Sequence, residues 1–452
     1  MLPRHPGSPR HILPRAPQGV ATLVVVMLLF FLLALASAYT NRNLIFEQKS
    51  ATNQYRSTQA FEAAEAGLEW AISRLNTGRI TDSCEAGGDS DVSFRDRYLG
   101  SFATDGTITP PNRTDAPTRP LLPACVFDGS VWRCNCPSQG PALPNVSGAD
   151  DLPAFRLQFT LPRWPLAPYA DIPPGVVQVV STGFSRCGGQ CVVDTPSAAG
   201  GDAMAVVTSL LALRGGVATP PGAALTVQGT LSHTGAGSML RVVNNGQDGG
   251  SATVETANGV TIQAGGAVDT TKMSLESLAG TPGDRSVVQN DPSFSAQGLD
   301  VDDRMFTSVF GMTSDLYRQQ PGAVILDCSA ACSAATVQAA VTRNPGLVIW
   351  ANGNVTLNGN IGSSTAPVVL VATGPVRLLS GVFYGLLYSR AEPSWPIGDD
   401  PADAGQVHGA VVAQGSMSGQ GQQLIQYNAD ILKRLRTQSG SLIRVPGGWK
   451  DF

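Results

Sequence analysis

The sequence is poor in residues that carry out most enzyme chemistry. Of its four histidines, His5 and His11 precede the long apolar run, and His233 and His408 stand alone, so we expect turn or surface positions for the latter two. It has no Walker A loop and no HExxH motif. Gly415-Ser-Met-Ser-Gly419 carries methionine where a nucleophile elbow needs serine. We therefore predict a non-enzymatic protein with no cofactor and no metal site.

Charge is also scarce, and it is balanced. Thirty basic and 34 acidic residues give a net charge of −4, which implies no general attraction to nucleic acid. Aromatic residues make up only 6% of the chain, against 50 glycines and 32 prolines. Glycine at this level without a collagen period predicts many tight turns between short strands. The 452 residues exceed one ordinary domain, and their 42% hydrophobic content can fill a core.

The N-terminal region has no charged residue between Arg15 and Arg42, and Val20 to Tyr39 is almost wholly apolar. Twenty residues of helix span about 30 Å, the thickness of the hydrocarbon layer of a bilayer. The arginines before this run predict a cytoplasmic N-terminus, with everything after Arg42 on the other side. A secretory signal is the main alternative, because Ala36-Ser37-Ala38 fits a signal-peptidase site.

A long helix is expected to continue past this apolar run. From Val20 to Asn76 there is no proline and one glycine, Gly67. Apolar residues recur at mostly helical spacing beyond the apolar run, at Leu44, Ala51, Tyr55, Phe61, Ala64, Leu68, Ile72 and Leu75. We predict one helix over residues 20–77, about 85 Å long at the helical rise. A plain membrane anchor followed by a coiled-coil stalk is the other interpretation. Glu62, Glu65 and Glu69 share a face and are expected to form a solvated stripe.

All eight cysteines follow the apolar segment, in pairs with short spacers, which predicts disulfides in an oxidising compartment. Their spacing does not fit a zinc site. We expect Cys187 to pair with Cys191, and Cys328 with Cys332. The remaining four allow three connectivities, and they are Cys84, Cys125, Cys134 and Cys136.

The region after the helix is expected to form a small head over residues 78–213. Residues 78–151 are rich in glycine, proline, aspartate and threonine and are predicted to be irregular. Three strand-like runs then follow, at Phe155–Leu161, Val176–Thr182 and Ala203–Leu213. An antiparallel meander of these strands could pack onto the amphipathic half of the helix, which gives an α+β head.

Residues 214–452 change in character and contain a repeat. The run 347–357 (LVIWANGNVTL) aligns with 368–378 (VVLVATGPVRL), 21 residues later, and looser copies begin at Gly385 and Gly409. This period predicts a β-solenoid, that is, a parallel β-helix, with a β-sandwich as the alternative. The run Asn428–Arg436 has helical spacing and is expected to cap the solenoid or pack along it.

The segment Tyr55–Glu69, YRSTQAFEAAEAGLE, resembles the N-terminal region of PilX-type minor pilins, in the superfamily of type IV pilins and pseudopilins. The resemblance covers about residues 18–76. It implies a leader over residues 1–19, cleavage between Gly19 and Val20 by prepilin peptidase, and methylation of the new amine. It also implies membrane and filament contacts at Val24, Phe30, Phe31, Tyr39, Phe61 and Leu68. Most pilins have glutamate at the fifth mature position, which here is Val24.

By this resemblance the chain is expected to be a minor pilin-like subunit of a type IV pilus that primes assembly or lies at the tip, with a head for binding and adhesion. The implied partners are other minor pilins, the major pilin, a tip adhesin, prepilin peptidase and the inner-membrane assembly platform. The expected location is the inner membrane and then the pilus, with the head periplasmic or extracellular. The alternatives are a pseudopilin of a type II secretion system, a secreted β-helix enzyme acting on polysaccharide, and a fixed inner-membrane scaffold.

Overall fold

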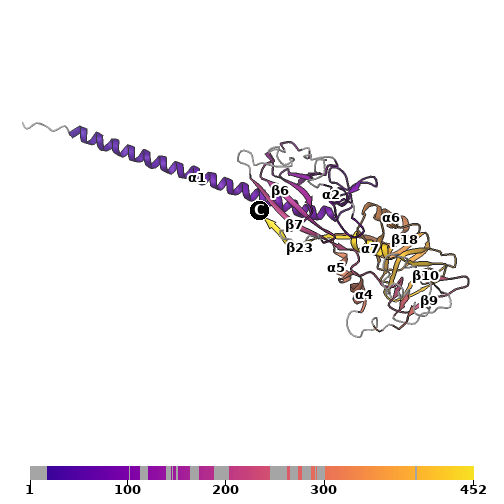
Figure 1. Cartoon of the computed structure of the whole chain (residues 1–452). Coiled ribbons are helices and arrows are strands. Elements are labelled where there is room, and N and C mark those ends of the chain that lie inside the picture. Colours follow the sequence, from indigo (N-terminus) through magenta and orange to yellow (C-terminus); the bar gives the residue numbers. More distant parts are fainter. Residues whose placement is uncertain are drawn as a thin grey trace, which may run out of the picture. The chain divides into compact units, whose positions relative to one another are not determined.

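The computed structural model describes residues 18–100, 102–111, 121–138, 144, 146–148, 151–162, 173–187, 203–244, 262–264, 273–276, 287–290, 292, 301–391 and 394–451. The chain divides into two compact units, residues 1–58 and 59–452. Helix α1 (Gln18–Leu75) runs through both (Figure 1). Its bounds lie within two residues of those predicted from the absence of proline.

The head of the second unit is a six-stranded antiparallel sheet in the order β23-β7-β6-β5-β3-β4. The three predicted strands correspond to β5 (Ala154–Thr160), β6 (Val176–Phe184) and β7 (Met204–Gly215). They pair in sequence as an antiparallel meander, as expected. The other strands are β3 (Ala124–Phe127), β4 (Trp132–Asn135) and β23 (Gly440–Asp451).

The expectation of an irregular region over residues 78–151 was wrong for part of it. Strands β3 and β4 form a hairpin there, and helix α2 (Phe94–Leu99) buries Phe94, Tyr98 and Leu99 against the head core. A short two-stranded sheet precedes α2, with β1 (Arg79–Ile80) paired to β2 (Val92–Ser93). These elements are too short for a hydrophobic period to emerge, and the core contacts that stabilise them come from distant segments.

The second half of the chain contains a twelve-stranded sheet whose strand pairs are all parallel. Its central path joins β14 (Ala323–Ser333), β15 (Val348–Asn358), β16 (Val368–Ala372), β18 (Val382–Ser389), β20 (Gln406–Ala413) and β22 (Leu424–Tyr427). Off this path, β17 (Val376–Ser380) also pairs with β15. Ile349 pairs with Leu370 and Val355 with Val376, the 21-residue offset of the sequence repeat. Parallel pairing is not the arrangement of a β-sandwich.

The looser repeat copies also stack in register. Gly385 of β18 lies opposite Gly409 of β20, and a Cβ on either would come within 2 Å of a backbone oxygen, at 1.8 and 1.9 Å. Both glycines have φ angles near +145°, at 145° and 143°, a conformation that side-chain-bearing residues rarely adopt. The repeated glycine therefore marks a position where neighbouring strands meet without room for a side chain.

The first strands of this region in sequence pair with its last strands. β8 (Leu225–Val227) pairs with β20, and β10 (Leu240–Asn244) pairs with β22. Strand β12 (Met273–Glu276) continues the path by pairing with β10, whereas β11 (Ile262–Ala264) pairs with β8 and with β13 (Val287–Val288). A separate parallel sheet joins β19 (Ser394–Pro396), β21 (Ser416–Gly419) and β9 (Leu231–His233).

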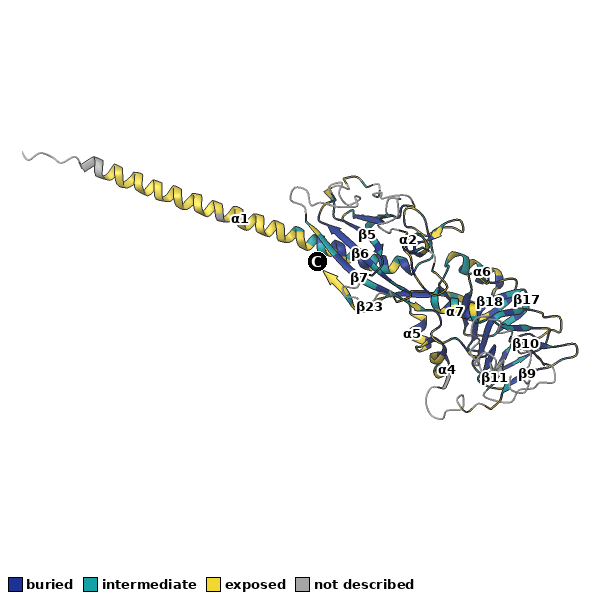
Figure 2. Cartoon of the chain, in the orientation of Figure 1, coloured by how far each residue is buried: buried dark blue, intermediate teal, exposed yellow. Residues whose placement is uncertain are grey.

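The strands around β18 are largely buried (Figure 2). Both faces of the central parallel strands are covered, so every residue of β16 is buried. Ile349 and Leu370 point to one core, while Trp350 and Val371 belong to another. The second core is completed by α4 (Val301–Phe310), α5 (Ser314–Arg318) and α7 (Ala429–Thr437). Helix α6 (Ala334–Arg343) covers the first core. Two-sided burial accounts for the unbroken apolar runs of these strands.

The expected boundary at residue 213 does not separate the two sheets. After α7 the chain returns to the head, where β23 pairs antiparallel with β7. The parallel region is therefore inserted between two neighbouring strands of the head sheet, β7 and β23. Residues 440–451 belong to the head, against the prediction of one domain over 214–452. Helix α7 packs along the parallel strands through Leu432 and Leu435, as the pattern of Asn428–Arg436 indicated.

Candidate functional site

The N-terminal part of α1 exposes a continuous apolar surface. Val24 has 50% of its surface exposed, Phe30 68%, Phe31 63% and Tyr39 69%. Gly19 and Val20, the predicted processing pair, lie in the first turn of the helix. Within the described residues, α1 is one helix long and apolar enough to cross a membrane, a property that signal sequences share. A surface of this size in water would drive association, so it needs a lipid or protein partner.

The same helix is buried where it enters the head, and small residues make the contact. Ala60, Ala64 and Ala71 are fully buried, and Leu68 is 1% exposed. Phe61 is half-buried at the edge of this core. Leu68 was predicted to contact the membrane or filament, but it packs in the core of its own head instead. By contrast, Leu44, Ala51 and Tyr55, which the helical period placed on the same stripe, are exposed. The AAEAGLE motif thus coincides with the start of the helix's contact with the sheet.

Two glycines bring the helix backbone close to the sheet. A Cβ at Gly183 of β6 would lie 2.1 Å from the carbonyl oxygen of Ala60 and 2.4 Å from the amide nitrogen of Ala64. A Cβ at Gly67 would lie 2.4 Å from Ser181 Oγ. The motif's glycine and small residues are therefore needed for close approach, a role that the apolar period alone did not reveal.

Three glutamates lie on the outer side of this helix. Glu62, Glu65 and Glu69 are all exposed, in agreement with a solvated stripe. Glu69 accepts a hydrogen bond from Arg444 of β23 at 2.7 Å. The stripe thus faces solvent, with one surface ion pair to the last strand.

The C-terminal end of α1 is joined to β23 by a buried side chain. Asn76 Nδ2 donates to the Leu442 carbonyl oxygen, and the Leu442 amide donates to Asn76 Oδ1, both at 2.8 Å. Arg95 of α2 donates from Nε and Nη2 to the Leu75 carbonyl and from Nη2 to the Gly440 carbonyl. The bonds from Arg95 to Leu75 satisfy a helix-end carbonyl that would otherwise lack a partner, and the others bond to β23. The last strand is thereby fixed to the end of the helix.

Two disulfides between described residues lie in the head, and a third lies within β14 of the parallel region. The structure pairs Cys84 with Cys136, Cys125 with Cys134, and Cys328 with Cys332. The third pair is the one expected from spacing, and the first two resolve the open connectivity. Cys187 is also in a disulfide. Its expected partner, Cys191, lies outside the described residues.

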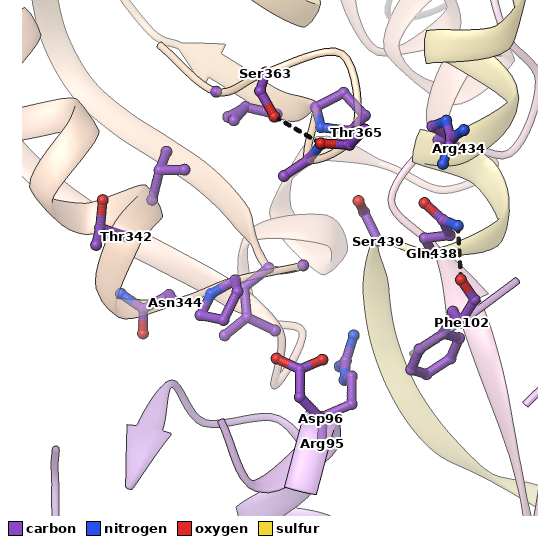
Figure 3. A pocket seen from close by; sticks show the side chains of 18 of the residues that line it. Arg95, Asp96, Phe102, Thr342, Asn344, Ser363, Thr365, Arg434, Gln438 and Ser439 are labelled. Carbon is purple, nitrogen blue, oxygen red and sulfur yellow. Dashed lines mark hydrogen bonds between the residues drawn. The ribbon is translucent and has the colours of Figure 1, made fainter. Parts of the chain in front are cut away.

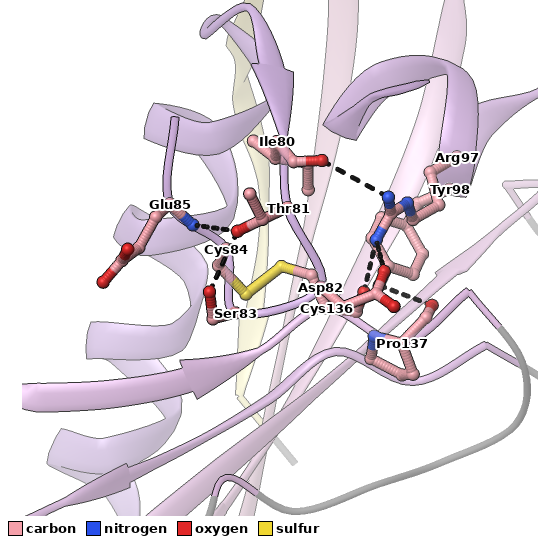
Figure 4. Close-up of polar contacts among 10 residues, drawn as sticks. All are labelled: Ile80, Thr81, Asp82, Ser83, Cys84, Glu85, Arg97, Tyr98, Cys136 and Pro137. Carbon is pink, nitrogen blue, oxygen red and sulfur yellow. Dashed lines mark hydrogen bonds and ion pairs between the residues drawn. A yellow bond between two sulfur atoms is a disulfide. The ribbon is translucent and has the colours of Figure 1, made fainter. Parts of the chain in front are cut away.

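A polar network surrounds the Cys84–Cys136 bond (Figure 4). Arg97 of α2 pairs with Asp82 at 2.7 Å and also donates to the backbone carbonyls of Cys136 and Ile80. Tyr98 donates its hydroxyl to the Pro137 carbonyl at 3.0 Å, and burial raises its pKa. The network holds α2 against the segment that carries both cysteines.

The two lone histidines do not share a site. His233 is fully buried in β9, against the expectation of a turn or surface position, and its Nε2 contacts the Gly421 carbonyl at 3.0 Å. Burial lowers the pKa of His233 and that of His408. His408 is half-buried in β20 and stacks edge-on against Tyr384. Among the described residues, no group of three or more His, Cys, Asp or Glu side chains is arranged to hold a metal.

Comparison with known proteins gives a family match over part of the chain and remote structural alignments. Residues 18–69 match the family model described as PilX N-terminal. The competence-associated pilin ComZ from Thermus thermophilus aligns over 88% of this chain and 97% of its own, at 13% identity and a TM-score of 0.19. A score that low supports no argument about fold or function. No curated protein matches this chain. Over residues 18–69, the chain therefore resembles the N-terminal region of the PilX-type minor pilins.

Proposed function

We propose that this chain is a non-enzymatic minor pilin-like subunit of a type IV pilus. The observation that carries the proposal is the change in burial along α1. Its first part exposes apolar side chains from Leu23 to Tyr39, and its last part is buried in a folded head. A subunit that stays in the membrane and later packs against other helices needs such a free apolar segment joined to a stable head. The match of residues 18–69 to the PilX N-terminal model supports the same function.

In this proposal residues 1–19 are a leader, and prepilin peptidase cleaves between Gly19 and Val20. The apolar part of α1 then anchors the subunit in the inner membrane, with the leader cytoplasmic and the head outside. Disulfides support an oxidising compartment for the head, because they persist outside the reducing cytosol. The remaining site residues, Phe30, Phe31 and Tyr39, would contact lipid first and neighbouring subunits later.

We further propose that residues 217–437 form a β-solenoid and that the subunit lies at or near the pilus tip. Parallel strands stacked in register support the solenoid, as does the 21-residue offset between β15 and the next strands. A region of this size would be difficult to repeat along a close-packed fibre. Val24 also supports a position at the tip. Most pilins have glutamate here, and a glutamate inside the membrane implies a partner in the neighbouring subunit, which a chain with valine does not require.

The implied partners are other minor pilins, the major pilin, a tip adhesin and the assembly platform. The head and solenoid would provide the outward-facing surface for binding and adhesion. Immunogold labelling of purified filaments tests the location. Labels confined to filament ends support the tip, whereas even labelling at the abundance of the major subunit would exclude it.

The first experiment is to determine the mature N-terminus by mass spectrometry of protein extracted from native membranes. We expect N-methylated Val20. Two variants separate the processing routes: Gly19→Val should block prepilin cleavage, and Ala38→Leu should leave it unchanged. A mature start at Tyr39, blocked by Ala38→Leu, would instead support a secreted protein. An uncut Met1 would support a fixed membrane anchor.

A further inference from the structure

A cavity of about 610 Å³ lies between the head and the parallel-strand region, with all its lining residues in the unit 59–452. Arg79, Arg95 and Phe102 line it from the head, and Arg434 and Gln438 from α7 and the residues after it. Figure 3 shows the labelled side chains around a common opening. Its volume is in the range of small-molecule sites in proteins.

The cavity is rich in positive charge that is not neutralised within the described protein. Arg79, Arg95 and Arg434 come from three separate elements, and the single described carboxylate in the lining is Asp96. Asp96 is exposed, and one of its oxygens already accepts a hydrogen bond from Ser93 at 2.7 Å. None of the three arginines forms an ion pair with a described residue. Three cations facing one partly engaged carboxylate create a site that favours an anion.

Arg95 supplies a second, independent indication. The residue is 3% exposed, yet its Nη1 group has no hydrogen-bond partner among the described residues, while Nε and Nη2 donate to backbone carbonyls. Figure 3 shows its guanidinium directed toward the opening. Burial lowers the pKa of Arg95 to about 10, which leaves it charged at neutral pH. A buried charged donor without an acceptor is rare in native proteins and marks a place for a ligand oxygen.

We propose that this cavity binds a small polar molecule that carries a carboxylate or phosphate group. The oxyanion lies between Arg95 Nη1 and Arg434, whose planar guanidinium groups match the oxygens of either anion. Arg79 adds positive charge to the site, although its Nε and Nη1 already donate to the Thr342 and Asp91 carbonyls. Hydroxyl and amide groups on the rim, including Thr365 and Gln438, bond the neutral part of the ligand. Because head and parallel strands both contribute, the bound molecule stabilises the junction between them.

The test is isothermal titration calorimetry of the detergent-solubilised full chain at low ionic strength. Sodium phosphate and sodium glucuronate are the anionic probes, and glucose is the neutral control. We expect saturable binding of at least one anion, with glucuronate tighter if the natural ligand is an acidic sugar and phosphate tighter if it is a phosphate. Glucose should not bind. The same anion should raise the thermal midpoint of the protein, because it binds only the folded state.

Arg434→Gln is the critical variant, because this guanidinium lines the cavity without a partner in the described protein, so we expect its loss to leave the fold intact. We expect anion binding to weaken about tenfold, because one charge-assisted hydrogen bond to the anion is lost. The matched control is Arg436→Gln on the same helix, which does not line this cavity and should leave affinity within twofold. Arg79→Gln provides a second test. No saturable binding of either anion, equal binding of glucose, or unchanged affinity in both Arg434→Gln and Arg79→Gln would overturn the proposal.

Discussion

Substituting Gly183 with alanine tests the close contact between α1 and the head sheet. The added carbon would lie 2.1 Å from the Ala60 carbonyl oxygen and 2.4 Å from the Ala64 nitrogen. Both atoms belong to the backbone of a regular helix, so no side-chain rotation can relieve the overlap. The backbone of Gly183 is not in the left-handed region, so alanine adds no strain there.

The size of the effect follows from this geometry. The helix must move away by about 1 Å, which forfeits a quarter to a half of the dispersion energy of each contact along the interface. Overpacking of this kind costs about 1–3 kcal/mol. Alanine's advantage over glycine in a strand, about 0.5–1 kcal/mol, acts in the opposite direction. We expect Gly183→Ala to lower the free energy of unfolding of the head by about 2 kcal/mol.

Hydrogen exchange of the full chain, read on peptides from residues 59–76 and 176–184, measures this change locally. Gly222→Ala is the matched control, because a Cβ there meets no atom within 4 Å. That variant should stay within about 0.5 kcal/mol of the unsubstituted chain. Unchanged exchange in Gly183→Ala would show that the helix does not approach β6 as closely as described.

Three further predictions concern the junction, the parallel region and the head. Asn76→Ala should cost about 2–3 kcal/mol and speed exchange in β23, because it leaves two buried backbone groups unpaired. Arg444→Ala removes an ion pair whose side chains, Arg444 and Glu69, are 40% and 69% exposed, and it should cost about 0.5 kcal/mol or less. Equal losses of stability in Asn76→Ala and Arg444→Ala would contradict the role given to Asn76. The pKa of His233 is lower in the folded protein, so the unfolded chain binds the extra proton and stability should fall as pH drops below about 6.5. His233→Gln should reduce this fall in a thermal-denaturation series, and an identical pH profile would refute it. Replacing Cys84 and Cys136 together with alanine should lower stability by about 4 kcal/mol, because their disulfide closes a loop of 52 residues, and an unchanged urea midpoint would contradict this.

Long periodic segments were predictable from the sequence, and short ones were not. Helix α1 follows from 57 residues without proline, and β5, β6 and β7 from alternating or continuous apolar runs. The 21-residue repeat gave the register of β15 against β16 and β17. Helix α2 and the β3–β4 hairpin were missed because their stability depends on distant core residues and a disulfide. The buried position of His233 was missed for the same reason.

The candidate sites divide in the same way. The apolar run, the processing pair and the resemblance to PilX-type pilins are local features, readable along the chain. The proposed anion-binding cavity is not readable in this way, because Arg79, Arg95 and Arg434 are far apart in sequence and no spacing rule connects them. The pairing of Cys84 with Cys136 likewise depends on which strands lie side by side.

The sequence by itself determined the long helix, its apolar half, the meander of the head and the repeat of the parallel strands. These features depend on the periods of the helix and strand, which each segment carries alone. Only the tertiary structure decided that the parallel region is inserted between β7 and β23, and that its first strands stack on its last. Such pairings are set by the burial of faces from distant segments, a property of the whole chain that no local pattern encodes.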